Sequence, residues 1–418
     1  MIARSFPLFL AAAALCAAPP ARAQTLHQAL AIYFENDVEG ALPIFEALSA
    51  SRPDDPDLRT WLGDALMRLD ETDAALEQGR AALRVRPCHS GAHNLLAAVY
   101  IRHLYMEPGG LDSMWTHASR AVECEPNDGN VWLNYWMAGI MRRDTAAPLR
   151  AQRRLKELDF FTGPVMERAR WMLRSAPPGA VLVANGDTDF FPMGIVQAVE
   201  GLRPDVELVQ RVMLEFPWYV RRVSARTGLP MPAQVQGLGD DEWEPAVSDQ
   251  PLPEAAGAAW AAATLAGSAR PLVLTATSGV EWVQGAAAVR PDGGVYTLHP
   301  LAARGETGFA APHIGVLAAA MRQIDVERLN GPQASPADRS PVRWTEAHPA
   351  DVVMWMATYL AAVRYDAGDD GGAREVLVVA ERILATGGVS EGTAAMYAQL
   401  RALMGPPELE LPPELEIP

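Results

Sequence analysis

The sequence is short of the positive charge that binding to nucleic acids requires. It contains a single lysine, Lys156, and its 35 basic residues stand against 51 acidic ones, which gives a formal net charge of −16. No run of five basic residues occurs in the chain. Because such a chain repels phosphate backbones and anionic lipid headgroups, we expect neither a nucleic-acid partner nor peripheral binding to membranes.

Cysteines and long apolar segments are scarce as well. Three cysteines among 418 residues are too few for a disulfide-dense scaffold. After residue 23 no segment stays apolar for about 18 residues, the shortest stretch that suggests a membrane-spanning helix. Hydrophobic residues nevertheless make up 49% of the chain. Its length therefore predicts about two to four globular domains with buried cores.

The first 23 residues have the features of a secretory signal peptide. Arg4 precedes the apolar stretch 6–18, and small residues at positions 21 and 23 fit a cleavage site after Ala23. About 13 apolar residues cannot cross a hydrocarbon core that needs roughly 20, which argues against a membrane anchor. We therefore exclude residues 1–23 from the fold and expect the mature chain to be periplasmic or secreted.

An internal repeat with a period of 34 residues follows this segment. Each unit has small or apolar residues at helical spacing and then a proline. In the first unit these residues are Ala41, Phe45, Leu48 and Pro53, and in the second they are Ala75, Gly79, Ala82 and Pro87. The pattern resembles the tetratricopeptide repeat, in which small residues let two antiparallel helices cross closely and proline ends the second helix.

The repeat continues with a longer third unit, which ends at Pro126. Its excess length falls at residues 107–110, where we expect an extended loop between two helices. A fourth unit begins at Trp132, and residues 165–174 are expected to form a closing helix. Residues 24–174 are therefore predicted to form an array of tetratricopeptide-like helical hairpins.

Residues 175–179, rich in proline and glycine, mark a change to α/β patterning. Short apolar runs predict four strands, at residues 180–184, 206–212, 271–276 and 294–298. The helical spacing of residues 192–202 between the first two strands indicates a βαβ unit, whose strands are parallel. Residues 175–330 are thus predicted to form a small α/β domain with a mainly parallel sheet.

The last part of the chain returns to helical patterning. We interpret residues 331–348 as a linker, residues 349–404 as one or more helical hairpins, and the acidic, proline-punctuated residues 405–418 as a disordered tail. The predicted fold class is therefore α + α/β, with a tetratricopeptide array, a small α/β domain and a C-terminal helical hairpin.

Polar residues directly after the first predicted strand form the best candidate for a ligand site: Asn185, Gly186, Asp187 and Asp189. Open α/β sheets place ligands at the carboxyl ends of their strands. Two carboxylates two residues apart could hold a cation or accept hydrogen bonds from sugar hydroxyls. The alternative is structural, with Asp189 capping the next helix and Gly186 permitting a tight turn. The sequence leaves both interpretations open.

Five motifs resemble the soluble C-terminal region of a bacterial family of protein O-mannosyltransferase-like membrane proteins. They are NGDTDFFP at residues 185–192, VEGLRPDV at 199–206, PWY at 217–219, ARPLVLTAT at 269–277 and GGVYTLHP at 293–300. In that family the first motif usually reads NGDNDTFP, and asparagine and threonine precede PWY. This chain has Thr188 and Phe190 in the first motif, and Glu215 and Phe216 before the third.

The resemblance implies an α/β module linked to glycosylation at the cell envelope. In the family a multi-spanning membrane part of glycosyltransferase type precedes this region, and the sequence contains no counterpart of it. We therefore do not expect this chain alone to transfer sugars. Two polar positions of the family motifs are phenylalanine here, whereas the four candidate residues of the first motif are retained.

Two further sets of residues in the repeats are candidate sites. Trp132, Tyr135 and Trp136 could line a groove for a partner, although such residues commonly belong to a core.

Cys88 and Cys124 remain after signal removal and lie near the ends of second helices in adjacent repeats, so we predict a disulfide between them. A zinc site that combines both cysteines with His89 and His93 is the alternative. We predict no cofactor and no bound metal.

These observations favour an exported tetratricopeptide scaffold that binds a protein or peptide partner. Its α/β module would then be a second interaction module linked to envelope glycosylation. The alternative is a small-ligand binding protein or enzyme that uses the 185–189 turn for a sugar or a metal. A third interpretation is a structural part of an envelope membrane complex. We lean against an enzyme, because no nucleophile elbow, phosphate-binding loop or metalloprotease motif occurs.

Overall fold

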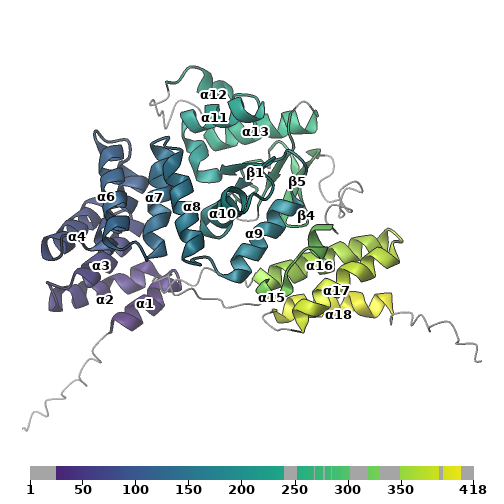
Figure 1. Ribbon diagram of the computed structural model, residues 1–418, viewed down its shortest axis with the longest axis horizontal. Helices are drawn as coiled ribbons and strands as arrows, with labels where there is room; N and C mark the ends of the chain where they lie inside the picture. Colours follow the sequence, from purple (N-terminus) through teal and green to yellow (C-terminus); the bar gives the residue numbers. More distant parts are fainter. Residues whose placement is uncertain are drawn as a thin grey trace, which may run out of the picture. The chain divides into compact units, whose positions relative to one another are not determined.

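The computed structural model describes residues 25–239, 252–267, 269–275, 278–283, 285–301, 319–329, 349–385 and 389–405, without the side chains of residues 187, 188, 291, 292 and 349. The predicted signal peptide, the predicted linker and all of the predicted tail after residue 405 lie outside these ranges. The chain forms two compact units, of which the first ends at Val99 and the second begins at Tyr100 (Figure 1).

The first unit consists of packed helical hairpins. Its helices are α1 (Leu26–Phe34), α2 (Val38–Ser51), α3 (Pro56–Arg68), α4 (Thr72–Val85) and α5 (Ser90–Val99), and each packs against the next along the chain. Three of them begin after a short polar residue whose side chain accepts a hydrogen bond from a backbone N–H of the first turn, namely Thr25, Asp37 and Asp55.

The core of this unit confirms the repeat pattern. Ala41, Phe45 and Ala75 are fully buried. Gly79 allows α4 to approach α5 closely, because a Cβ at this position would lie 2.8 Å from the side chain of Leu96. Small residues therefore occupy the helix crossings, as the tetratricopeptide pattern requires.

The second unit begins with the later repeat helices. They are the π-helical turn η1 (Tyr100–Leu104) and the helices α6 (Gly110–Cys124), α7 (Gly129–Met141), α8 (Ala146–Glu157) and α9 (Gly163–Ser175). The chain leaves helical structure between Leu104 and Gly110, and Gly109 has a φ of 77° there. This is the extended loop that the excess length of the third repeat predicts. The domain bounds expected from the sequence stay predictions.

The α/β part contains a five-stranded mixed sheet with the strand order β2-β1-β3-β5-β4. The strands are β1 (Val181–Ala184), β2 (Glu207–Gln210), β3 (Leu272–Leu274), β4 (Ala288–Asp292) and β5 (Val295–His299). Strand β1 is parallel to β2 and β3, whereas β5 is antiparallel to β3 and β4. The sequence pattern misses β4, because Arg290 and Pro291 interrupt its apolar run.

Helices cover both faces of this sheet. Helix α10 (Phe191–Glu200) connects β1 to β2, and α13 (Leu252–Leu265) precedes β3 on the other side of β1. Right-handed crossovers in opposite directions place these helices on opposite faces. Figure 1 shows α13 with α11 (Pro217–Thr227) and α12 (Ala233–Gln236) on one side of the sheet, and α10 with α9 on the other. The carboxyl ends of β1 and β3 therefore form a topological switch point.

The C-terminal helices complete the second unit. They are α15 (Val326–Leu329), α16 (Pro349–Asp366), α17 (Asp370–Leu384) and α18 (Glu391–Met404). Helix α16 packs against both α17 and α18, and α9 contacts α15 and α16. The predicted fold class is confirmed, with a repeat array, a small α/β sheet and a C-terminal helical region. Among the described residues, no helix is both long and apolar enough to cross a membrane.

Candidate functional site

The 185–189 segment lies directly after β1, at the topological switch point. It enters a π-helical turn, η2 (Gly186–Phe190), that continues without a break into α10. Gly186 is exposed and has a φ of 69°, a backbone conformation that favours glycine. Asn185 precedes the turn in an extended conformation, and its side chain does not cap it. The side chain of Asp187 lies outside the described residues.

Asp189 does not cap a helix. Because η2 continues into α10, the backbone N–H groups after residue 190 are not free for a cap, and no side chain caps α10. Asp189 is fully buried, and its Oδ1 lies 3.0 Å from Nη2 of Arg168 on α9. The cap role expected for Asp189 is therefore wrong. Its carboxylate joins the sheet edge to α9 and does not face solvent.

Phe190, which departs from the family pattern, and Phe191, which matches it, both contact a repeat helix. Both are buried, and their rings lie 5.9 Å and 4.8 Å, respectively, from the ring of Trp136 on α7. Gly194 completes the contact, because a Cβ there would lie 2.7 Å from the same indole. A phenylalanine in place of the family's threonine thus anchors α10 to a repeat helix.

A polar cluster that the sequence pattern does not reveal lies at the carboxyl end of β2. Arg211 Nη2 lies 3.7 Å from Oε1 of Glu254, and the guanidinium carbon lies 5.6 Å from the ring centre of Trp282. Oε1 of Gln210, Oε2 of Glu254 and Nε1 of Trp282 have no hydrogen-bond partner among the described residues. The cluster therefore holds buried donors and acceptors that the described residues do not satisfy. Its members come from distant parts of the chain, so no motif could identify them.

A buried tyrosine forms a hydrogen bond with the backbone at the carboxyl end of β2. The hydroxyl of Tyr219 accepts a hydrogen bond of 3.1 Å from the backbone N–H of Gln210. Burial raises the pKa of Tyr219 to about 12, so the phenol stays protonated at neutral pH. The PWY motif thus contributes one structural residue to the sheet edge.

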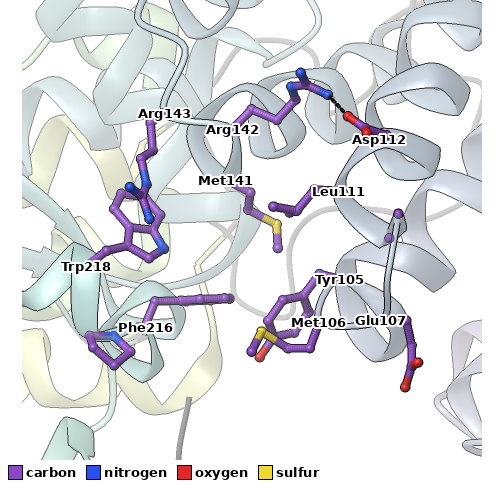
Figure 2. Close-up of a pocket in the computed structure, with 13 residues that line it drawn as sticks. Tyr105, Met106, Glu107, Leu111, Asp112, Met141, Arg142, Arg143, Phe216 and Trp218 are labelled. Atoms are coloured by element: carbon purple, nitrogen blue, oxygen red, sulfur yellow. Dashed lines mark hydrogen bonds and ion pairs between the residues drawn. The ribbon is translucent and has the colours of Figure 1, made fainter. Parts of the chain in front are cut away.

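A cavity of about 560 Å³ lies between the repeat helices of the second unit and α11 (Figure 2). Its apolar lining consists of aromatic, methionine and leucine side chains, namely Tyr105, Met106, Leu111, Met141, Phe216 and Trp218. Tyr105 belongs to the extended loop before α6, and its ring centre lies 4.9 Å from that of Phe216. Phe216, the other phenylalanine at a polar position of the family motifs, therefore also contacts a repeat element.

Two arginines from the end of α7 line the same cavity. Nη1 of Arg142 lies 2.7 Å from Oδ1 of Asp112, and the guanidinium carbon of Arg143 lies 5.1 Å from the centre of the Trp218 ring. Arg143 has a φ of 60° just after α7, where glycine is the usual residue. The cavity therefore combines an apolar, aromatic lining with two cationic and two acidic side chains, the latter from Glu107 and Asp112.

The aromatic residues expected to line a partner groove are buried. Trp132, Tyr135 and Trp136 are 4%, 5% and 2% exposed. Nε1 of Trp132 donates a hydrogen bond of 3.0 Å to the carbonyl oxygen of Pro126. The groove role is therefore wrong, because α7 directs these side chains into the core of the second unit. Some of the residues that do line a cavity, among them Tyr105 and Met106, lie in the loop before α6, which the sequence marked only as extended.

Cys88 and Cys124 are both disulfide-bonded in the structure. The neighbouring histidines are engaged elsewhere: Nε2 of His89 lies 2.9 Å from Oδ1 of Asp57, and Nε2 of His93 lies 3.1 Å from a backbone carbonyl oxygen. In the described part of the chain, no group of three or more potential ligands could hold a metal ion. The zinc alternative thus lacks its thiolate and imidazole donors. The pairing of the two cysteines with each other stays a prediction.

A peptide map of the unreduced mature protein is expected to contain a fragment that joins Cys88 to Cys124. By restricting the unfolded chain, such a bond stabilises a fold by about 2–4 kcal/mol. Reduction should therefore lower the midpoint of thermal unfolding, and Cys88→Ser should lower it to a similar extent without reductant. Two free thiols in the unfolded, unreduced protein contradict the pairing.

Comparisons with known proteins agree with both parts of this architecture. Residues 35–101 match the tetratricopeptide repeat family, and residues 165–243 match the family described as TMEM260-associated domain 2. The second match covers β1, the 185–189 segment, β2 and the PWY motif. The chain therefore carries N-terminal tetratricopeptide repeats followed by a TMEM260-associated domain.

One curated relative and one solved structure give the extent of the similarity. The chain is 26% identical over 137 residues to protein O-mannosyl-transferase TMEM260 of Mus musculus, a match that covers 32% of this chain and 18% of that protein. This match thus spans less than a fifth of the relative's length. The crystal structure of a thermophilic tetratricopeptide repeat protein of Thermus thermophilus is 20% identical and matches with a TM-score of 0.28, covering 31% of this chain and 69% of that one.

Proposed function

We propose that this chain is an exported scaffold that binds a segment of a partner protein in the 560 Å³ cavity beside α11. Helical repeats of the tetratricopeptide type commonly present binding surfaces to other proteins. The lining of the cavity supports the proposal, because tryptophan, tyrosine, phenylalanine, methionine and arginine are the residues enriched where proteins bind one another.

The observation that carries the proposal is the exposure of apolar side chains at this cavity. Met106 and Leu111 are 46% and 39% exposed, and both line it. The lining also carries charges of both signs, Arg142 and Arg143 with Glu107 and Asp112, and Arg142 is paired with Asp112. The partner segment that fits these features is a peptide with an apolar anchor.

The backbone at Arg143 supports the same site. A glycine after α7 would adopt the left-handed conformation without strain, whereas an arginine there is disfavoured by about 1 kcal/mol. Strained positions cluster at functional sites. We infer that Arg143 is retained for its side chain, which covers the face of Trp218 at the cavity.

The α/β module connects this scaffold to glycosylation at the cell envelope in our proposal. The match to TMEM260-associated domain 2 and the similarity to a mouse protein named as an O-mannosyl-transferase support this connection. Transfer of sugars would belong to a membrane partner in the same complex. The mature chain would begin at Gln24 in the periplasm or outside the cell, and sequencing of its amino terminus from the envelope or the medium tests this part.

The alternative proposal, a sugar or metal site at the 185–189 turn, has less support. Asp189 forms an ion pair with Arg168 and is fully buried. No observation on the described residues favours a catalytic role for the turn.

Site-specific cross-linking tests the scaffold proposal. A photoreactive phenylalanine analogue at Met106 should cross-link to a partner in intact cells, and mass spectrometry of the adduct identifies the segment bound. A synthetic peptide of that segment should bind the mature wild-type chain in calorimetry. Met106→Asp with Leu111→Asp should weaken this binding at least about tenfold, which corresponds to about 1.4 kcal/mol, because both side chains are exposed and line the cavity.

Two further variants make the outcome specific. Arg143→Gly should weaken binding while leaving thermal stability equal or slightly higher, because it relieves the backbone. Val199→Ala, at an exposed apolar residue of α10 that does not line the cavity, should leave binding unchanged. The proposal fails if the adduct peptide binds the Met106→Asp, Leu111→Asp variant as tightly as it binds wild type.

A further inference from the structure

Helix α16 is apolar on every side. From Val352 to Val363 it contains no charged residue. It packs against α17 and α18, but four residues at helical spacing stay accessible. Trp355 is 37% exposed, and the other three are partly exposed, namely Val352, Tyr359 and Ala362. We call these four residues the α16 stripe. Because a helix that is hydrophobic all round is normally buried, the stripe is a surface that a further chain segment can cover.

The α16 stripe begins at a cavity of about 280 Å³. Val352 and Trp355 line this cavity together with residues of α9, the β4–β5 turn and the first turn of α18. The ring of Tyr359 lies parallel to that of Trp355, with ring centres 5.8 Å apart. The apolar surface therefore continues from the cavity along α16.

The hairpin of α16 and α17 follows the repeat pattern of the N-terminal array. Ala373, Leu377 and Ala380 of α17 lie at intervals of four and three residues, as do the small and apolar residues of each N-terminal repeat. All three are buried. Because arrays of such hairpins present extended binding surfaces, the exposed stripe of this hairpin suits an extended chain segment.

The chain itself carries such a segment directly after α18. Residues 406–411 and 412–417 read PPELEL and PPELEI, so a motif of six residues occurs twice. Glutamates alternate with large apolar residues, which are Leu409, Leu411, Leu415 and Ile417. Since alternate side chains of an extended chain point to the same side, the segment can present one apolar side while its glutamates face water.

The spacings of the stripe and the segment agree. Alternate residues of an extended chain lie about 6.6 Å apart. Residues four positions apart on a helix, such as Trp355 and Tyr359, are separated by a rise of about 6.0 Å along its axis. Successive apolar side chains of residues 406–418 can therefore contact successive residues of the α16 stripe.

The starting point of the segment allows this contact. At the start of α16, Oδ1 of Asp351 accepts a hydrogen bond of 2.7 Å from the N–H of Ser390. Near its end, the hydroxyl of Tyr365 donates one of 3.2 Å to the carbonyl oxygen of Leu403. Helices α16 and α18 are thus parallel, and the segment begins beside the end of α16. Its 13 residues span up to about 43 Å when extended, whereas Trp355 lies only about 15 Å back along the helix.

We propose that residues 406–418 fold back along the α16 stripe of the same chain and place an apolar side chain in the 280 Å³ cavity. The segment is then an internal ligand that keeps the C-terminal hairpin from binding other apolar segments. This contact is separate from the peptide cavity beside α11, so either proposal can fail without the other.

A photoreactive phenylalanine analogue at Trp355 tests the contact in the full mature chain. Irradiation should join it to a residue between 409 and 417, and the adduct should be a monomer because both ends belong to one chain. The same analogue at Val378, which is exposed on α17 and does not line the cavity, should give no such adduct.

Two matched variants of the segment leave the folded helices untouched. The serine-tail variant carries Leu409→Ser, Leu411→Ser, Leu415→Ser and Ile417→Ser, and it should lower the yield of the Trp355 adduct at least about tenfold, because the apolar contacts are lost. The glutamine-tail variant carries Glu408→Gln, Glu410→Gln, Glu414→Gln and Glu416→Gln. It should leave the yield unchanged, because these side chains face water.

A synthetic peptide of residues 406–418 measures whether the stripe is occupied. Fluorescence anisotropy of the labelled peptide should give a dissociation constant of about 10 µM for the serine-tail variant. The wild-type chain should bind the peptide about a hundredfold more weakly, because its own tethered segment competes at an effective concentration near 1 mM.

The proposal is overturned if the peptide does not bind the serine-tail variant at about 1 mM, or if it binds the wild type and the variant equally well. Equal adduct yields for the serine-tail and glutamine-tail variants also contradict it. Adducts that join two copies of the chain would assign the stripe to a second copy, and adducts with another protein would assign it to a partner. Either result rules out the intrachain contact.

Discussion

Replacement of Arg168 by methionine is expected to lower the free energy of unfolding of the second unit by about 3–5 kcal/mol. Asp189 is fully buried, and Arg168 is the cation beside it, with Nη2 and Oδ1 3.0 Å apart. Methionine keeps much of the length of the side chain but removes the counter-charge that Arg168 provides to a buried carboxylate. Urea unfolding, followed by hydrogen exchange of peptides from α9 and α10, measures the loss.

A double-mutant cycle shows whether the pair itself is responsible. Asp189→Leu combined with Arg168→Met should recover a large part of the loss, because apolar replacement of both partners of a buried pair is often nearly neutral. Arg322→Met is the matched control, since Arg322 and Glu375 form an ion pair of 2.8 Å in which both side chains are about half exposed. It should cost at most about 1 kcal/mol. An equally small cost for Arg168→Met would contradict the buried pair.

The outcome of this cycle decides how the first motif is understood. If Asp189 is structural, the motif positions the switch point by joining β1 and α10 to α9. A loss of stability in Asp189 variants then says nothing about ligand binding. Binding by the turn would have to rest on Asn185 and on Asp187, whose side chain lies outside the described residues.

The repeat array could be predicted from the sequence because its signal is local. The period of 34 residues places Ala41 and Ala75 at equivalent helix crossings, and both are fully buried. The long third unit is also informative, since its extra residues fall between Leu104 and Gly110, where the helices are interrupted. Such features depend on residues within one hairpin, so spacing along the chain is sufficient.

The helix cap expected at Asp189 is wrong because the interaction that this side chain makes is not local in the sequence. Its partner, Arg168, belongs to another helix, and no spacing rule connects the two. The aromatic residues of α7 show the same limit. Helical spacing places Trp132 and Trp136 on one helix, but only the packing of α10 and α8 decides that this face is buried. Strand β4 could not be predicted from its own residues, because Pro291 interrupts the apolar run. It forms because the turn between β4 and β5 brings the two strands into pairing.

The two phenylalanines at family motif positions have a structural role that the sequence does not show. From the motifs alone, they are only positions at which the family has a polar residue and this chain does not. In the structure Phe190 packs on Trp136, and Phe216 packs on Tyr105. Both therefore join the TMEM260-like part of the domain to repeat elements of the same compact unit. A comparison with the family motifs could identify the positions, but not the aromatic partners that they meet.

Replacement of Arg170 by methionine is the other change expected to cost about 3–5 kcal/mol. Its guanidinium makes two hydrogen bonds to Glu200, of 2.8 Å and 2.7 Å, and a third of 2.9 Å to Glu167, whose side chain is 3% exposed. Lys156 also binds Glu200, at 2.9 Å. This network joins α9 to the end of α10, so its loss should loosen the attachment of α10.

The network also predicts how stability depends on pH. Burial opposes the ionisation of Glu200, but hydrogen bonds from Arg170 and Lys156 outweigh it and lower the pKa of its carboxyl from 4.5 to about 2. The folded protein therefore binds this proton less readily than the unfolded chain. The resulting stabilisation is fully present above about pH 4.5 and is lost as the pH falls towards 2. With solvent screening it amounts to about 2 kcal/mol.

Glu200→Gln separates this group from the other carboxylates of an acidic chain. The urea midpoint of the wild-type protein should fall between pH 4.5 and 2 more steeply than that of Glu200→Gln, which has lost the titrating group. In Arg170→Met the difference should shrink, because Lys156 alone then holds the carboxylate. Parallel curves for the wild type and Glu200→Gln would mean that Glu200 titrates alike in the folded and unfolded chains. The ion pairs between α9 and α10 would then contribute no more than exposed pairs do.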